Sequence, residues 1–155
     1  MSEILGIIAE YNPFHNGHLY HLEVSKRLID PTYTVCIISG NFAQRGIPSV
    51  INKWEKTKIA LESGADLVIE LPTVYSISSA ENFAQGAIKI LENFKANTIL
   101  SFGSECGDIS ILKNISQILT DEPAEYKSLL AHELSARQFI SKSSRKSFAY
   151  VFKRC

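Results

Sequence analysis

Two histidines three residues apart, His15 and His18, have the side-chain types and spacing best suited to chemistry in this 155-residue chain. They follow an apolar segment, residues 4–9, that is interrupted at Pro13 and leads into a segment with helical spacing. The first N–H groups of a helix lack partners within it and lie at the positive end of its dipole, so they favour an anion. Gly17 allows a close approach to that backbone. The pattern predicts a phosphate site to which both imidazoles donate hydrogen bonds.

The same spacing also fits a metal site, or histidines that serve packing alone. Zinc needs further ligands, and no cysteine or acidic cluster lies beside the pair. His21 continues the spacing, but each step of three residues turns the helix by roughly 300°, so His21 leaves the shared face. Zinc therefore fits this spacing less well than an anion does. On the pattern alone, the alternative that both histidines serve packing only stays open.

Apolar runs alternate with amphipathic segments along the chain. Such alternation is typical of an α/β fold with a doubly wound parallel sheet, in which ligands bind outside the carboxyl ends of the strands. We expect strands at residues 4–9, 33–39, 66–71 and 97–102, and helices at residues 17–28, 53–63, 79–94 and 108–119.

Composition excludes several classes of protein. The 16 basic and 16 acidic residues balance, which argues against a generally basic surface for nucleic acid. Three cysteines, Cys36, Cys106 and Cys155, form no C-x-x-C pair and predict reduced thiols. No apolar run approaches the roughly 18 residues of a membrane span. We therefore expect a cytoplasmic protein without a membrane segment.

Five sequence blocks occur in a specific order. They are Glu-Tyr-Asn-Pro-Phe-His-Asn-Gly-His at 10–18, Ser-Gly-Asn-Phe-Ala-Gln-Arg-Gly at 39–46, Asn-Lys-Trp-Glu at 52–55, Gly-Ala-Asp-Leu-Val-Ile-Glu-Leu-Pro at 64–72 and Phe-Gly-Ser-Glu at 102–105. Together they resemble the N-terminal portion of the bacterial tRNA(Met) cytidine acetate ligases, members of the H-x-G-H nucleotidylyltransferase superfamily. The resemblance covers about the first two thirds of the chain.

The resemblance implies a Rossmann-like sheet of the nucleotidylyltransferase type and an ATP-dependent reaction with Mg²⁺. Acetate attacks the α-phosphorus of ATP to give acetyl-adenylate and pyrophosphate, and the acetyl group then passes to the wobble cytidine of elongator tRNA(Met). Two alternatives remain: a small-molecule adenylyl- or cytidylyltransferase that uses the same histidines, and a truncated ATP-binding fragment without full ligase activity.

The resemblance also implies roles for individual residues. His15 and His18 are the catalytic pair and act as electrostatic donors, not as bases. A bound triphosphate favours their cationic forms, so we expect activity to fall at high pH. The residues implied to bind the nucleotide are Ile8, Asn12, Phe14, Gly17, His21 and Gly103.

The loop after the second strand offers amide and guanidinium groups that suit a carboxylate, a phosphate or a base edge. Its candidates for substrate binding are Asn41, Gln44 and Arg45, together with Lys53 at the start of the next helix. By spacing alone, Arg45 fits a solvated loop arginine better, and Lys53 equally fits an amphipathic helix start. Trp54 is expected in the core and not as a platform for base stacking.

Two acidic residues follow the fourth predicted strand. Glu105 and Asp108 are candidate ligands for magnesium, although a helix cap is the favoured role for Asp108. We expect residues 1–134 to form the nucleotide-binding domain. Residues 135–155 lack the later nucleotide-site motifs of the longer family and are expected to be a divergent basic tail, truncated or disordered.

Overall fold

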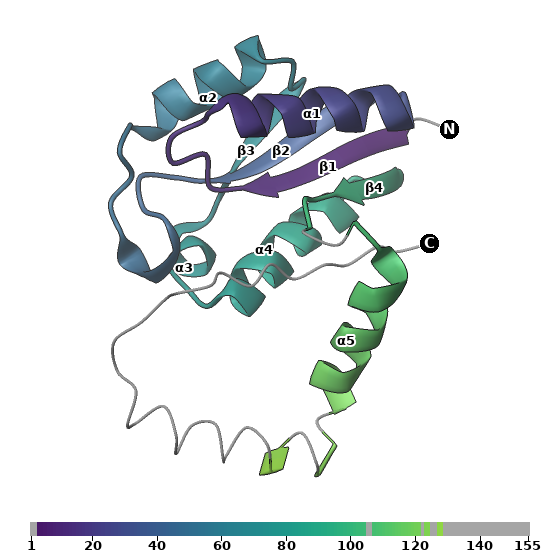
Figure 1. Ribbon diagram of the computed structural model, residues 1–155. Helices are drawn as coiled ribbons and strands as arrows, with labels where there is room; N and C mark the ends of the chain where they lie inside the picture. The colour runs from purple at the N-terminus through teal and green to yellow at the C-terminus, as the bar shows by residue number, and fades with distance from the viewer. Residues whose placement is uncertain (1–2, 105–106, 122, 125–126, 129–155) are drawn as a thin grey trace. The chain divides into compact units, whose positions relative to one another are not determined.

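The computed structural model describes residues 3–104, 107–121, 123–124 and 127–128. Its strands are β1 (Glu3–Ala9), β2 (Tyr33–Ser39), β3 (Leu67–Leu71) and β4 (Asn97–Ser101), as Figure 1 shows. Its helices are α1 (Asn16–Ile29), α2 (Lys53–Glu62), α3 (Thr73–Ser76), α4 (Ala80–Glu92) and α5 (Ile109–Asp121). All four expected strands and all four expected helices are confirmed within a few residues. The short helix α3 and a 3₁₀ turn at Gln44–Gly46 were not expected.

The four strands form one parallel sheet in the order β3-β2-β1-β4. In register, Ile7 of β1 lies opposite Cys36 of β2 on one side and Ser101 of β4 on the other. The chain moves outward from β1 to β3 and then returns to the opposite side of β1. This reversal confirms the doubly wound sheet and places the crevice beside the carboxyl end of β1.

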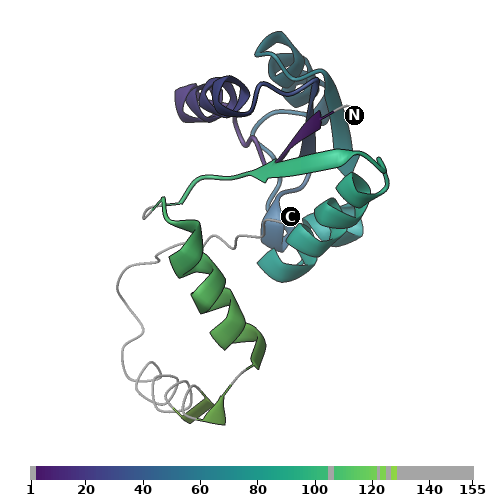
Figure 2. The ribbon, with the colours of Figure 1, turned by 90° about the vertical axis from the view of Figure 1, so that its right-hand side faces the viewer.

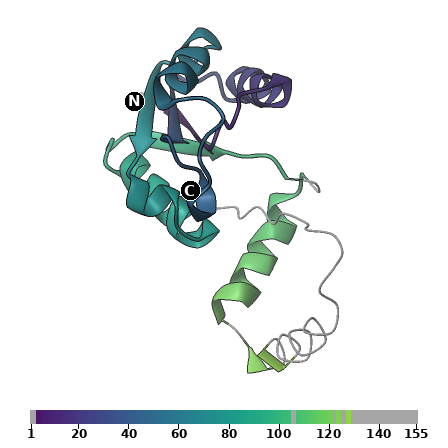
Figure 3. The ribbon, with the colours of Figure 1, turned by 90° about the vertical axis from the view of Figure 1, so that its left-hand side faces the viewer.

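Residues that alternate along the strands supply two separate core clusters, as expected for a sheet covered on both faces. Figures 2 and 3 show α4 on the face opposite α1 and α2. One cluster includes Leu5 and Ile7 with Leu22 of α1, whereas the other joins Ile4 to Leu91 of α4. Both faces of the sheet are therefore anchored by helices, which leaves its carboxyl edge to the loops.

Two glycines are required by the packing around α4. A Cβ on Gly6 would lie 2.7 Å from Leu91 Cδ1, so its absence lets α4 approach β1 closely. A Cβ on Gly86 would lie 2.5 Å from Tyr75 Cγ and 2.9 Å from Tyr75 Cβ. Gly86 therefore allows α3 and α4 to pack against each other.

The chain divides into two compact units after Gly103. Helix α5 belongs to the second unit, and its Ile111, Ile115 and Ile118 are all exposed. The proposed boundary at residue 134 stays a prediction, and the expected basic tail at 135–155 lies outside the described residues. Within the described part of the chain, no helix has the length and apolar character needed to cross a membrane.

The packing at Gly86 predicts an unusual result for Gly86→Ala. Alanine normally favours a helix over glycine by roughly 1 kcal/mol, but here the added methyl collides with the base of a side chain and overpacking costs about 1–3 kcal/mol. We expect a net loss of stability in chemical denaturation. The exposed neighbour Gln85 supplies the control, because Gln85→Ala should change stability by less than about 0.5 kcal/mol. A stabilised Gly86→Ala variant would contradict the observed packing.

Candidate nucleotide site at the carboxyl edge of the sheet

The loop between β1 and α1 brings the two predicted histidines together. His15 is the N-cap of α1 with an extended backbone (φ −145°, ψ 173°), and His18 occupies the third helical position. Their rings stack with centroids 3.7 Å apart and planes 26° apart. The expected shared side of the two imidazoles is therefore confirmed.

Each ring accepts a backbone hydrogen bond through Nδ1. The Gly17 N–H donates to His15 Nδ1 (3.1 Å), and the His15 N–H donates to His18 Nδ1 (3.2 Å). An Nδ1 that accepts cannot carry a proton, so in the neutral rings the proton lies on Nε2. Both imidazoles therefore present Nε2–H as a donor.

The two hydrogen bonds, in which each histidine ring accepts a backbone N–H at the start of α1, form a reciprocal cap. This cap changes one expectation about the start of the helix. The Gly17 N–H is occupied by His15, and the His18 N–H donates to the His15 carbonyl at 2.9 Å. The prediction of unpaired N–H groups is wrong for these two residues, because the cap satisfies them locally. Gly17 is needed instead for the ring itself, since a Cβ there would lie 3.0 Å from His15 Cε1.

Aromatic side chains hold His18 in place. The Tyr11 ring meets the Phe14 ring edge-on at 4.7 Å and the His18 ring at 5.0 Å, and the Phe14 and His18 rings are 5.5 Å apart. Burial, then the charges of His15 and His21, lower the pKa of His18 to about 4. In the ligand-free chain His18 is therefore neutral at pH 7.

His21 connects α1 to the end of β4. Its Nε2 lies 2.9 Å from Ser101 Oγ, which in turn lies 2.7 Å from Ser25 Oγ. Burial lowers the pKa of His21. His21 therefore has a structural partner in Ser101, and it is not part of the stack that His15 and His18 form.

The other residues implied to bind the nucleotide lie in different surroundings. Ile8 packs against the core cluster that faces α4. Asn12 accepts a hydrogen bond from the Val50 N–H at 2.7 Å and so fastens the β1 loop to the loop before α2. Gly103 is exposed and does not have positive φ, and a Cβ added to it would meet no atom of the described residues within 4 Å.

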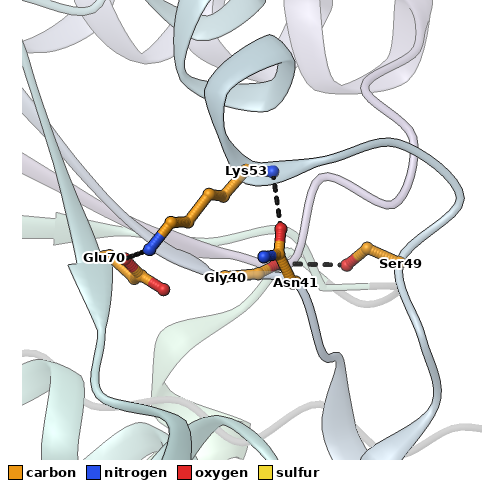
Figure 4. Close-up of polar contacts among 5 residues, drawn as sticks. All are labelled: Gly40, Asn41, Ser49, Lys53 and Glu70. Atoms are coloured by element: carbon orange, nitrogen blue, oxygen red, sulfur yellow. Dashed lines mark hydrogen bonds and ion pairs between the residues drawn. The ribbon is translucent and has the colours of Figure 1, made fainter.

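The loop after β2 is tied to α2 and β3, as Figure 4 shows. Asn41 Oδ1 accepts from the Lys53 N–H (2.9 Å), and Lys53 Nζ forms an ion pair with Glu70 at 2.7 Å. Lys53 therefore starts α2 and neutralises a carboxylate on β3. The expectation that Trp54 is in the core is wrong: it is 73% exposed, because two residues before the buried Lys56 it lies about 200° around the helix from the buried face.

Gln44 and Arg45 lie on the 3₁₀ turn of the same loop. The Gln44 N–H donates to Glu10 Oε1 at 2.7 Å, which joins this loop to the residue after β1. Arg45 has a left-handed backbone (φ 63°), and its N–H donates to the Ile77 carbonyl at 3.1 Å. Its exposed side chain is oriented by the turn and has no ion pair among the described residues.

One buried residue escaped the sequence analysis. Lys56 of α2 is fully buried and donates from Nζ to the Glu10 carbonyl, Ser39 Oγ and Ser49 Oγ at 3.0–3.1 Å. Its spacing in the sequence could have indicated this burial. Lys56 lies one turn before the buried Ala60 and therefore shares the face of α2 that is directed toward the sheet.

Comparison with known proteins decides the family. The family model described as HIGH Nucleotidyl Transferase matches residues 2–153. The chain belongs to this family.

Relatives of this HIGH nucleotidyl transferase include the tRNA(Met) cytidine acetate ligase of Thermoanaerobacter sp. (strain X514). The two are 55% identical over 133 residues, which cover 86% of this chain and 33% of the relative. The ligase of Acetivibrio thermocellus is also 55% identical, over 85% of this chain and 32% of its own length. The chain thus spans about a third of the length of these relatives.

The fold has solved counterparts. The crystal structure of Thermotoga maritima TmcAL bound with alpha-thio ATP matches with a TM-score of 0.76 and 46% identity, over 86% of this chain and 32% of that one. The apo form of the same protein matches with a TM-score of 0.77. The Rossmann-like α/β architecture of the nucleotidylyltransferase type is therefore confirmed.

The candidate metal ligands of this HIGH nucleotidyl transferase give no cluster in the described residues. Asp108 Oδ1 accepts from the Ser110 N–H (2.8 Å) and Oγ–H (2.7 Å) at the start of α5. The favoured role of Asp108 as a cap is confirmed, and these bonds lower its pKa. Glu105 lies outside the described residues. No group of three His, Cys, Asp or Glu side chains that could hold a metal occurs in the part of the chain that the structure describes.

The lowered pKa of His18 predicts how stability changes with pH. The folded pKa is about 4 and the ordinary value is 6.5, so between these values the unfolded chain binds a proton that the folded chain does not. Stability should therefore fall as the pH decreases from 6.5 toward 4. We expect thermal unfolding of His18→Gln to change less than that of the parent chain between pH 7.5 and 5.5. Equal changes in the two proteins would contradict this role of His18.

Proposed function

We propose that this chain carries the ATP site of a tRNA(Met) cytidine acetate ligase. The observation that carries the proposal is the stacked pair His15 and His18, whose Nε2–H groups are left as donors by the reciprocal cap. This pair lies where the strand order reverses, which is where open α/β sheets bind ligands. The names of its relatives, and the ATP analogue bound in TmcAL of Thermotoga maritima, support the same assignment.

In this proposal the triphosphate lies against the two imidazoles. Neutral Nε2–H donors suit phosphate oxygens, and the negative charge of the ligand raises the pKa of His18, so that a proton is taken up as ATP binds. The adenine or ribose lies toward Gly103. Neither a left-handed backbone nor a close neighbour accounts for glycine at this position, and close approach of a ligand to the backbone does.

The reaction needs alignment and charge stabilisation, with no covalent enzyme intermediate. A carboxylate oxygen of acetate bonds to the α-phosphorus, while the bond from that phosphorus to the bridging oxygen breaks and pyrophosphate leaves. His15 and His18 stabilise the charge that builds up on the phosphate oxygens. The acetyl group of the resulting acetyl-adenylate then passes to the wobble cytidine of tRNA(Met), and AMP leaves.

The substrate side of the site is assigned to the loop after β2. Asn41 and Gln44 are held by contacts to α2 and Glu10, while the Arg45 guanidinium projects from a fixed turn. Guanidinium groups bind carboxylates and phosphates with two parallel hydrogen bonds, so Arg45 is assigned to tRNA(Met) or acetate. Lys53 is assigned a supporting role, because its ammonium is paired with Glu70.

Magnesium is assigned to the nucleotide. Mg²⁺ usually keeps several waters and binds substrate phosphates together with one or two carboxylates. The cap of α5 occupies Asp108, so we assign no protein ligand to the metal. Because the proposed substrate is a tRNA, we assign the reaction to the cytoplasm.

Calorimetry with ATP and Mg²⁺ tests this function. We expect the parent chain to bind ATP and to take up protons at pH 7, visible as a heat that depends on the ionisation enthalpy of the buffer. His18→Ala should weaken ATP binding by roughly 10- to 150-fold, because one donor to a charged oxygen is worth about 1.5–3 kcal/mol. Absence of ATP binding by the parent chain would contradict the proposal.

Product analysis separates the three candidate functions. Pyrophosphate release that requires acetate, followed by acetylation of tRNA(Met) transcripts, is expected for the ligase. ATP binding without acetate-dependent pyrophosphate release would favour an ATP-binding fragment. A nucleotide-diphosphate product from a phosphorylated small molecule would favour an adenylyl- or cytidylyltransferase. His18→Ala, assayed beside the parent chain, distinguishes chemistry at this site from contamination.

A further inference from the structure

Lys56 joins three segments of the candidate site from beneath. Its side chain is fully buried, and its Nζ lies 3.1 Å from the Glu10 carbonyl oxygen, 3.1 Å from Ser39 Oγ and 3.0 Å from Ser49 Oγ. Glu10 follows β1, Ser39 ends β2 and Ser49 lies in the loop before α2. One side chain therefore holds in place the loops that carry the histidines and the substrate-binding candidates.

The hydrogen-bond directions around Lys56 fix its charge. Ser39 donates its hydroxyl proton to the Glu10 carbonyl (3.0 Å), and Ser49 donates its own to the Gly40 carbonyl (3.0 Å). Each hydroxyl has only one proton, so both serines accept from Lys56, and a carbonyl can only accept. Three acceptors require three N–H donors. An ammonium has three and a neutral amine has two, so Lys56 is charged.

Burial opposes the positive charge of Lys56, whereas nearby carboxylates and three hydrogen bonds support it. Burial lowers the pKa of Lys56, whereas the negative charges of Glu10 and Glu70 raise it. The three hydrogen bonds also favour the charged form, since each needs a proton on Nζ. The network therefore supports the charged form of Lys56 against the burial that lowers its pKa.

No carboxylate pairs directly with this cation among the described residues. The two ion pairs found there join Lys53 to Glu70 and Lys58 to Glu62. Glu10, the other nearby acid, accepts from the Gln44 N–H through Oε1. Glu10 and Glu70, the two acids that act on Lys56, are therefore balanced by Lys56 and Lys53, and loss of the Lys56 charge would leave the base of the site net negative, whereas His18 is neutral at pH 7.

We propose that Lys56 is a positioning residue that retains the anionic triphosphate through its buried positive charge while it holds the β1 and β2 loops in register. This inference rests on the proposed ATP site and adds to it the cation that keeps the acidic base of the site from repelling the triphosphate. A buried charge is weakly screened, so it acts on the phosphates without touching them. Adenosine carries no phosphate and is neutral, so the charge of Lys56 does not strengthen its binding.

A comparison of ATP with adenosine tests the inference. Lys56→Met removes the charge and keeps a long, unbranched side chain. Lys58→Met is the matched control, because Lys58 is exposed on the same helix and pairs with Glu62 at 3.9 Å. By NMR titration, we expect Lys56→Met to weaken ATP binding on the order of tenfold and to change adenosine binding less than about twofold. Lys58→Met should bind both ligands as the parent chain does.

Other outcomes overturn the inference in distinguishable ways. If Lys56→Met weakens the binding of ATP and of adenosine equally, Lys56 has a purely structural role. If ATP binding by Lys56→Met is unchanged, Lys56 does not contribute to the site. A parent chain that binds no ATP overturns the proposed function as well. If Lys56→Met fails to fold, Ser49→Asp places a carboxylate beside Nζ and should weaken ATP binding selectively, whereas the neutral Ser49→Asn should not. Equal ATP binding by these two variants would also overturn the inference.

Discussion

The reciprocal hydrogen bonds between two histidines and the first turn of α1 determine the character of this site. By accepting backbone N–H groups through Nδ1, His15 and His18 end the β1 loop, start the helix and fix the tautomer of both rings. Tyr11 and Phe14 then pack against His18, while burial, followed by the charges of His15 and His21, lowers its pKa. The N–H groups of Gly17 and His18 are therefore satisfied locally, and the imidazoles add Nε2–H donors to those that the start of α1 offers to a ligand.

The parallel sheet explains why distant parts of the sequence meet at this point. In Figure 1 the loops after β1 and β2 emerge on the same side of the sheet, and polar contacts join them below the rim. Asn12 binds the Val50 N–H, Glu10 binds the Gln44 N–H, and Lys56 binds both loops at once. Loops without regular structure gain rigidity from such contacts, so the substrate-binding candidates are presented by a fixed rim.

Much of this arrangement could be predicted from the sequence, because it follows from local patterns. Apolar runs indicated the four strands, and the order of strand and helix indicated the doubly wound topology. Trp54 was placed in the core because a large aromatic favours burial, but it lies on the face of α2 opposite the buried Lys56 and Ala60. Lys56 was missed for the converse reason, since lysine is rarely buried unless several acceptors converge on it. Such convergence depends on tertiary contacts between three segments and has no local signature.

The central claim is that both imidazoles stand ready as Nε2–H donors to a triphosphate. Long-range ¹⁵N NMR of histidine-labelled chain, recorded at pH 7 before and after addition of ATP and Mg²⁺, measures this directly. The account predicts unprotonated Nδ1 and protonated Nε2 for His15 and His18 in the free chain, with both Nε2 resonances shifting when ATP binds. Protonated Nδ1 in either ring, or Nε2 resonances unchanged at saturating ATP, would contradict it.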